Sequence, residues 1–479
     1  MVWSAWLRSL NTSENTTTAP LPVRFLAEVN ASVGAGALFT DPGDCWPYGY
    51  DNSRRHALPQ AVVFASSHSQ VVEIVKACNR HRIVLTPRGA GTGTTGATVP
   101  DRGGVVLSLE RMNRILGIDP ANRSARVEPG VTNQELQQAL SQHGFFWPPD
   151  PTSAAVCTLG GNLAYNSAGP RAVKYGTPRE NTLGLRAVTG DGRELRTGVV
   201  TSKGVVGYDL TRLLIGSEGT LAIITEAVLK LTPQAEAKAT LQASYRSIHS
   251  AAAAVSAIMA QPITPCALEF MDRTAIEMVR SFSGLDLETD AGALLMIEVD
   301  GPAYALAQSV AAIESAAAVD GLIGIQVANT PQQIELLWNT RKALSPALRN
   351  VAPKKINEDV VVPVSRIPEL IEGLEQLSRK HAIRIVNFGH AGNGNIHVNL
   401  LANPDDKAEM ARALACLDAT FDLVLKLEGT LSGEHGVGLE KRDYIARELD
   451  PVALELMRGI KSRFDPNHIL SPGKMLPGA

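Results

Sequence analysis

The sequence predicts a mixed α+β protein of two or three domains. Its 479 residues exceed what a single hydrophobic core usually supports. Between about Pro59 and Pro233, short β-rich runs alternate with helical stretches and glycine-rich turns. From about Glu236 to Thr330, alanine-rich helical patterns alternate with longer strand-like runs, which indicates a second domain.

Local spacing predicts individual elements in the first half of the chain. Apolar residues recur at helical spacing over Val71–Cys78, and the apolar run Ile83–Thr86 predicts a strand that stops at the following proline. Thr132 and Glu135 have the spacing of a capping box, which predicts that a helix begins there.

The second half gives longer patterns. Ser250–Met259 and Pro368–His381 are expected to be helices. Ala293–Val299, Arg384–Phe388 and the run around Ile396–Leu401 are expected to be strands. The polar, glycine-punctuated tail after about residue 427 suggests a return to the first domain.

Composition excludes some classes of function. The formal net charge of −3 and the pI near 6.4 provide no broad positive field, so nucleic acid is not expected as a partner. The five cysteines show no CxxC spacing and are expected to be reduced and mostly buried. The apolar opening Met1–Leu10 lacks a cleavage site, so we expect a cytoplasmic location, with peripheral attachment at the inner face of the membrane left open.

Three glycine-rich segments stand out before residue 225. Pro87–Gly96 has four glycines in eight positions, so backbone N–H groups can converge there on phosphate oxygens. Its GxGxxG spacing does not indicate a nicotinamide site, because Pro100 interrupts the helix that such a site needs. Pro148–Gly169 and Gly216–Thr220 are similarly rich in small residues. Each could be a turn without a ligand, but three together favour a large, flat, phosphate-bearing cofactor.

A second cluster can bind a metal. His390 and His397 stand seven residues apart around a glycine turn, and Glu434 and His435 follow in a second glycine-rich turn. Two histidines and one carboxylate can form an open divalent site, which leaves positions for the hydroxyl and carboxylate oxygens of a substrate. The alternative is that these are ordinary loop histidines.

The glycine segments resemble the FAD-binding domain of the vanillyl-alcohol oxidase type. The similar branch contains D-lactate dehydrogenase, the glycolate oxidase flavin subunit and D-2-hydroxyglutarate dehydrogenase, and the resemblance covers about residues 40–475. It implies an α+β fold with a two-subdomain FAD-binding domain and a substrate (cap) domain of an antiparallel sheet plus helices. The expected divisions are a flexible arm (1–25), the FAD-binding domain (26–235), the cap domain (236–427) and a C-terminal segment returning to the FAD domain (428–479).

No histidine stands in the first glycine loop to form a covalent link to the flavin, so we expect FAD to be bound without one. Ser167 and Ala222 depart from the family pattern, and each adds a small group near the flavin. The implied cofactor-binding residues are Pro87, Arg88, Gly89, Ala90, Gly91, Thr92, Gly93, Asp150, Thr158, Gly160, Gly161, Asn162, Ser167, Ala168, Gly169, Gly219, Ile223, Ile224 and Asn399.

The motifs GHxGxGNxH and SGEHGxG also match those of the family. They imply that the metal, zinc or manganese, is bound by His390, His397 and Glu434, and that His435 is the general base. Arg341 resembles the arginine that binds the substrate carboxylate, and Asn399 is expected to face the substrate or the flavin. Relatives that act on dicarboxylates carry a lysine where Asn357 stands, which argues against 2-hydroxyglutarate.

The implied reaction is the FAD-dependent oxidation of a small D-2-hydroxy acid (D-lactate-like, glycolate or D-2-hydroxyglutarate) to the 2-keto acid, with hydride transfer to flavin N5. A separate electron acceptor is expected, either an electron-transfer flavoprotein, a quinone, a cytochrome or an iron–sulfur subunit. Alternatives are a flavin oxidase that uses oxygen, a metal-dependent hydrolase and a non-catalytic binding protein. A homodimer is left open.

Overall fold

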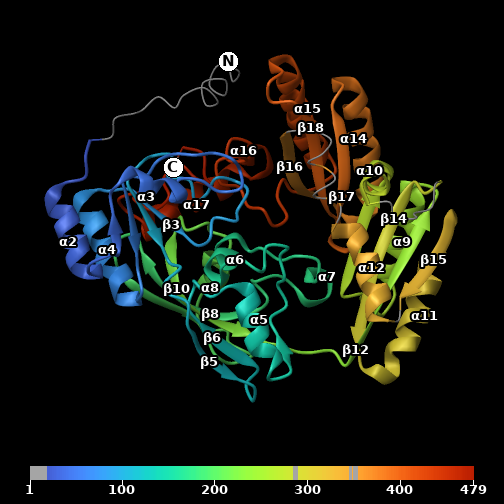
Figure 1. Cartoon of the computed structure of the whole chain (residues 1–479), viewed down its shortest axis with the longest axis horizontal. Helices are drawn as coiled ribbons and strands as arrows, with labels where there is room; N and C mark the ends of the chain where they lie inside the picture. The colour runs from blue at the N-terminus through green and yellow to red at the C-terminus, as the bar shows by residue number, and fades with distance from the viewer. Residues whose placement is uncertain are drawn as a thin grey trace.

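The structure is a computed structural model, and it describes residues 19–283, 290–328, 330–342, 344, 348 and 354–478. In this part of the chain the strands form sheets of four, five and seven strands and one two-stranded pair. The two smaller sheets lie at the left of Figure 1, and the seven-stranded sheet, which we call the large sheet, lies at the right.

The four-stranded sheet contains the first glycine segment. Its elements are α2 (Val23–Val33), β1 (Leu38–Phe39), α3 (Pro42–Cys45), η1 (Trp46–Tyr48), β2 (Ala61–Phe64), α4 (His68–His81), β3 (Leu85–Arg88) and β4 (Val105–Ser108). The strand order is β1-β2-β4-β3, with β2, β4 and β3 parallel. β2 and β4 are buried along their whole length, as is typical of parallel strands in a sheet with both faces covered.

The five-stranded sheet is antiparallel and has the order β5-β6-β10-β8-β9. The elements of this part of the chain are β5 (Ile115–Asp119), β6 (Ser124–Val127), α5 (Asn133–Ser141), β7 (Phe145–Phe146), α6 (Leu159–Tyr165), α7 (Ala172–Tyr175), β8 (Thr182–Thr189), β9 (Glu194–Gly198), α8 (Leu210–Leu214), β10 (Ala222–Lys230) and β11 (Thr232–Pro233). Of these, β7 and β11 form the separate two-stranded pair. Its core packs around the fully buried Trp147.

The large sheet is antiparallel and has the order β15-β12-β14-β13-β17-β18-β16. Its elements are β12 (Ala237–Tyr245), α9 (Ile248–Ala260), β13 (Ala267–Asp272), α10 (Arg273–Ser283), β14 (Ala293–Gly301), η2 (Ala303–Ala305), α11 (Leu306–Ala317), β15 (Leu322–Ala328), α12 (Pro331–Lys342), β16 (Lys354–Val361), η3 (Val364–Arg366), α14 (Ile367–His381), β17 (Arg384–His390), η4 (Ala391–Asn393), β18 (Asn395–Ala402) and α15 (Lys407–Lys426).

The two faces of the large sheet differ in chemistry. Leucine, isoleucine and phenylalanine side chains on one face pack in a single core with α9, α11, α14 and α15. Side chains alternate along a strand, so the cross-strand pairs Glu269–His390 and His397–Asp359 lie on the opposite face. That face carries the polar residues of the site.

The chain returns to the smaller sheets after α15. Helices α16 (Ile445–Glu448) and α17 (Pro451–Phe464), red in Figure 1, lie among the blue and green elements. Leu470 bridges to Leu85 of β3, and the buried ammonium of Lys461 donates to the carbonyl oxygen of Thr220 at 2.7 Å. The last segment therefore holds the four- and five-stranded sheets together.

Most predicted elements are present with slightly shifted ends. The helix predicted over Val71–Cys78 is α4, and the capping box before α5 makes both of its hydrogen bonds. The prediction that a strand stops before Pro87 was wrong, because β3 continues through Pro87 to Arg88. β3 lies at the edge of its sheet, where proline is tolerated because no neighbouring strand needs its missing N–H.

Other expectations concern the ends and the cysteines. All five cysteines are unpaired and buried, as predicted. Most of the predicted arm lies outside the described residues, but α2 already begins at Val23 and Phe25 is fully buried. Among the described helices, none is both long and apolar enough to span a bilayer.

The capping box gives a test of stability. We expect Thr132→Ala to lower the unfolding free energy by about 1 kcal/mol, because the N–H of Glu135 loses its acceptor. The measurement is a urea titration followed by tryptophan fluorescence, to which Trp147, packed in the same core as α5, contributes. Ser141→Ala, at the exposed far end of α5, is the control and should change little; equal losses in both variants would refute the assignment.

Candidate functional site

A narrow cavity lies where the end of β3 meets the beginnings of α6 and β10. Three segments that are remote in sequence form its wall, and two of them belong to different sheets. The wall consists of Pro87, Arg88, Gly89, Ala97, Thr98, Leu109, Pro129, Thr158, Gly160, Gly161, Ala164, Tyr165, Ser217, Glu218, Gly219, Ala222, Ile223 and Ile224. We call this cavity the cradle.

Glycines in the wall are needed because backbone segments approach one another closely. A Cβ atom on Gly89 would lie 2.2 Å from the hydroxyl oxygen of Thr158. A Cβ on Gly219, whose φ is +70°, would lie 2.6 Å from Cγ of Pro87. Larger residues would therefore force the three segments apart and deform the cradle.

The loop after β3 has the donors that a diphosphate requires. Between Gly89 and Thr95, no backbone N–H donates to another residue that the structure describes. The buried guanidinium of Arg88 donates to the carbonyl oxygens of Tyr50 at 2.6 Å and Pro47 at 3.5 Å, so it anchors the loop from behind. Free N–H groups on an anchored glycine loop fit the diphosphate of FAD.

The structure gathers most of the predicted cofactor residues. The cradle wall contains Pro87, Arg88, Gly89, Thr158, Gly160, Gly161, Gly219, Ile223 and Ile224, and the loop continues from it through Ala90, Gly91, Thr92 and Gly93. Asn162 instead turns toward the protein, with its side chain 3.3 Å from Cys157 Sγ and from Asn133 Nδ2.

Asp150 and the segment Ser167–Gly169 lie at the boundary with the large sheet. The N–H of Asp150 donates to the carbonyl of Ala168, and its carboxylate pairs with Arg171 at 3.1 Å. Burial raises the pKa of Asp150 to about 7, although the charge of Arg171 opposes that shift. These residues lie between the cradle and the group formed by His390, His397 and Glu434, which we call the histidine cluster.

Sequence analysis missed Tyr165 of the cradle. A Cβ atom on Gly93 would lie 2.5 Å from the Tyr165 hydroxyl, so this ring backs the glycine loop. One signal could have identified it: Tyr165 stands four residues after Gly161 in a helix and therefore lies on the same face.

Three predicted metal ligands converge. One ligand atom from each of His390, His397 and Glu434 lies within 4.8 Å of the other two. Nε2 of His390 lies 3.3 Å, and Nε2 of His397 3.9 Å, from the same oxygen of Glu434. The histidines come from the ends of β17 and β18, whereas Glu434 comes from Ser432–Gly438, which we call the Glu434 loop.

Two further contacts orient this cluster. Nδ1 of His390 lies 2.5 Å from the carboxylate of the buried Glu269 on β13. The N–H of Gly169 donates to the second oxygen of Glu434 at 2.8 Å. A carboxylate behind a histidine commonly fixes the ring of a metal ligand. Sequence analysis missed Glu269, although a lone glutamate in the apolar strand Ala267–Asp272 was a signal.

Charge favours a cation in the cluster. Burial alone would lower the pKa of His390, but the charge of Glu269 and hydrogen bonds with Glu269 and Glu434 raise it to about 10. Burial would raise the pKa of Glu434, but the hydrogen bond and charge of His390, with His397, lower it below its usual range. A bound metal ion could replace one proton of the His390 imidazolium, whose charge Glu269 and Glu434 stabilise.

His435 lies beside the cluster and against the cradle. Its ring stacks on that of His397, with centroids 5.3 Å apart and an interplanar angle of 21°. Its Nδ1 lies 3.4 Å from the fully buried carboxylate of Asp359. The Thr95 hydroxyl donates to its carbonyl oxygen at 3.4 Å, so His435 is next to the loop that forms the cradle.

Two predicted residues remain, Asn399 on β18 and Arg341 on α12. Asn399 is fully buried, and its Nδ2 donates to the carbonyl oxygens of Val386 and His397, both at 3.0 Å. Its Oδ1 has no hydrogen-bond partner among the described residues and can accept from a ligand. Arg341 lies on helix α12, but its side chain is outside the described residues.

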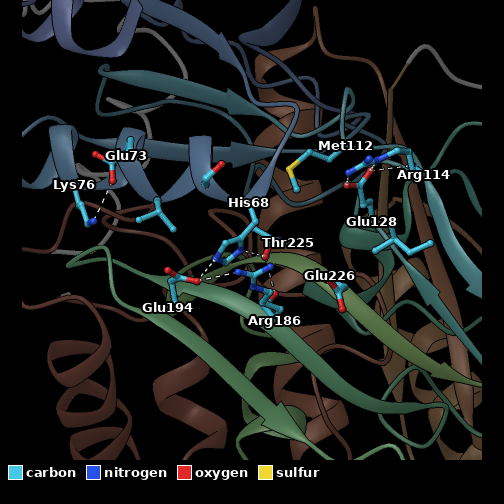
Figure 2. Close-up of a pocket in the computed structure, with 13 residues that line it drawn as sticks. His68, Glu73, Lys76, Met112, Arg114, Glu128, Arg186, Glu194, Thr225 and Glu226 are labelled. Atoms are coloured by element: carbon cyan, nitrogen blue, oxygen red, sulfur yellow. Dashed lines mark hydrogen bonds and ion pairs between the residues drawn. The ribbon is translucent and has the colours of Figure 1, made fainter. Parts of the chain in front are cut away.

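A larger cavity, of about 570 Å³, lies between α4 and the five-stranded sheet. Figure 2 shows that its charged side chains point toward one another. His68 and Arg186 both contact Glu194 at 2.9 Å, and Arg114 pairs with Glu128 at 2.7 Å. Because these charges are already paired, we place the chemistry at the cradle instead.

The geometry of the glycine loop predicts how FAD binding responds to mutation. We expect Gly91→Ala to weaken FAD binding about tenfold or more, because its φ is +70° and the new Cβ would lie 2.2 Å from the Arg88 guanidinium. Gly117→Ala, at an open strand position, is the control. Titration of apoprotein with FAD by flavin fluorescence measures both; unchanged affinity in Gly91→Ala would contradict the placement.

Comparison with known proteins identifies the families of both halves of the chain. Residues 59–198 match the family described as "FAD binding domain", and residues 234–475 match "FAD linked oxidases, C-terminal domain". Glycolate oxidase subunit GlcD of Bacillus subtilis (strain 168) is 39% identical over 89% of this chain and 91% of its own length. D-lactate dehydrogenase of Anaerostipes hadrus is 37% identical over 88% of this chain and 90% of its own length.

D-2-hydroxyglutarate dehydrogenase of Stutzerimonas stutzeri (strain A1501) is 33% identical over 94% of this chain and 98% of its own length. Among solved structures, p-cresol methylhydroxylase superposes with a TM-score of 0.77 at 18% identity, over 95% of this chain and 96% of that one. This likeness confirms the α+β fold of the vanillyl-alcohol oxidase type. The chain therefore belongs to the FAD-linked oxidoreductases of the D-lactate, glycolate and D-2-hydroxyglutarate type.

Proposed function

We propose that the protein oxidises a small D-2-hydroxy acid to the 2-keto acid with the help of a divalent metal ion. The observation that carries the proposal is the convergence of His390, His397 and Glu434 next to the cradle. The first two ligands come from one face of the large sheet and the third from a loop that touches the cradle. Substrate and cofactor could therefore meet there.

The bound groups would supply two kinds of chemistry. FAD would accept a hydride from C2 of the substrate, and the cation, zinc or manganese, would lower the pKa of the substrate hydroxyl. His435 would remove the hydroxyl proton, since its ring stacks on that of the ligand His397. Asp359, 3.4 Å from Nδ1 of His435, leaves the other ring nitrogen to face the substrate.

Binding and orientation would involve two other side chains. The unpartnered Oδ1 of Asn399 would accept a hydrogen bond from substrate or cofactor. Arg341 would bind the substrate carboxylate, as the family resemblance implies. Residues 26–235 would form the FAD domain, 236–427 the cap and 428–479 the returning segment, and electrons would leave to a separate acceptor.

The reaction and its base are tested together. Purified protein should be yellow, and its flavin absorbance should be bleached anaerobically by D-lactate, glycolate or D-2-hydroxyglutarate. We expect His435→Ala to retain FAD and metal but to lose about a hundredfold to ten-thousandfold in turnover, the usual contribution of a general base. His143→Ala, at an exposed position, is the control. Near-normal turnover in His435→Ala would refute its role.

The metal is tested by removing it. Treatment with a chelator should leave the yellow colour and reduce turnover about a hundredfold or more, because a Lewis acid contributes several kcal/mol to such a reaction. Zinc or manganese should restore turnover in the wild type but not in His397→Ala. Full activity in protein shown to be metal-free would exclude metal assistance. Hydrogen peroxide yield, compared with dye reduction, distinguishes an oxidase from a dehydrogenase.

A further inference from the structure

We propose that two buried carboxylates, Asp359 and Glu218, are positioning residues that hold the Glu434 loop by its backbone. Asp359 comes from strand β16 of the large sheet, and Glu218 comes from the turn before β10 in the cradle wall. Together they would fix where Glu434 and His435 stand relative to the cradle. The inference rests on the proposed function, in which those two side chains bind the metal and move the proton.

Asp359 accepts hydrogen bonds from the first half of the Glu434 loop. Its Oδ2 accepts three consecutive backbone N–H groups, those of Gly433, Glu434 and His435, at 2.9, 2.6 and 2.8 Å. Its Oδ1 accepts from the Ser432 hydroxyl at 3.2 Å. The side chain is fully buried, so water does not compete for these bonds.

Glu218 accepts hydrogen bonds from the second half of the Glu434 loop. Its two oxygens accept the backbone N–H groups of Val437 at 2.6 Å and Gly438 at 2.8 Å. Glu218 is buried and has a φ of +53°, a left-handed conformation that costs free energy in a residue with a side chain. The turn therefore tolerates an unfavourable backbone where the carboxylate reaches the Glu434 loop.

The loop needs such support because of its own sequence. It contains glycine at positions 433, 436 and 438, and Gly436 has a φ of +82°. Glycine gives a segment more backbone freedom than other residues, so the loop by itself would not hold one shape. Charge-assisted bonds from carboxylates to N–H groups are among the stronger hydrogen bonds, and five of them act on this one segment.

The two carboxylates also come from different parts of the fold, Asp359 from the large sheet and Glu218 from the turn that precedes β10 of the five-stranded sheet. The large sheet supplies His390 and His397 as well as Asp359, whereas the cradle wall supplies Glu218. Holding one loop from both sides fixes the distance between the histidine cluster and the cradle. A displacement of about 1 Å between reacting groups can cost about a hundredfold in rate, so this alignment matters for the reaction.

The experiment compares Asp359→Asn and Glu218→Gln with Glu448→Gln as a matched control, all in the FAD-loaded, metal-loaded full chain. Glu448 is also a carboxylate that accepts backbone and hydroxyl donors, from Leu431 N at 2.9 Å and Thr430 Oγ1 at 2.6 Å, but these two donors lie just before the loop. Hydrogen exchange of a peptide covering 432–439 reports the loop without any need for activity. Steady-state kinetics then separates kcat from KM.

We expect faster exchange of the loop in both test variants, together with a loss of about tenfold or more in kcat, a smaller change in KM and retained FAD. The control should keep wild-type loop exchange and kcat. Should Asp359→Asn fail to fold, because Lys441 loses its buried counter-charge, Glu218→Gln carries the test.

The outcomes are distinguishable. Unchanged exchange in Glu218→Gln would overturn the inference, and so would faster exchange with kcat within about twofold of the wild type, since the role would then be structural only. If wild-type protein oxidises no 2-hydroxy acid, the proposed function fails, whereas slow wild-type exchange that rises in the variants still supports the backbone hold itself.

Discussion

The site depends on how one short glycine-containing loop is held between two sheets. The Glu434 loop crosses from the large sheet to the cradle, with its N–H groups bonded to Asp359 on one side and Glu218 on the other. The Glu434 side chain then meets His390 and His397 on one side, and the backbone carbonyl of His435 accepts from the Thr95 hydroxyl of the loop after β3 on the other. If this segment moved, Glu434 and His435 would no longer stand between the two histidines of the large sheet and the cradle, so the two parts would no longer form one site.

The two faces of the large sheet have different roles: one stabilises the sheet, and the other carries the polar residues of the site. In the large sheet, one face packs its aliphatic residues against four helices, whereas the opposite face carries the polar residues of the site beside a smaller apolar cluster that includes Met271, Leu294 and Met296. The apolar face stabilises the sheet through burial, so the polar face can carry buried charges such as Glu269 and Asp359. Strand pairing then places Glu269 directly opposite His390, which supplies the carboxylate behind the ring.

In the cradle, the shape of the wall depends on backbone segments that approach one another closely. Close approach of three segments is possible because glycine occupies the contact points, as at Gly89 against Thr158 and Gly219 against Pro87. The Arg88 guanidinium, through Tyr50, and the C-terminal segment, through Leu85, hold the β3 segment of the wall in place. The wall of the cradle is thus built from groups that a long ligand could approach along its whole length.

The sequence by itself determined the family, the element types and the residues of chemical interest, because glycine spacing, helical periodicity and the histidine motifs are local patterns. It identified His390, His397 and Glu434 as candidate ligands. Only the tertiary structure brought these three together and revealed Glu269, Asp359 and Glu218, which are ordinary acidic residues until strand pairing buries them. The continuation of β3 through Pro87 was likewise decided by its edge position. Local patterns cannot specify such contacts, since they depend on which strands become neighbours.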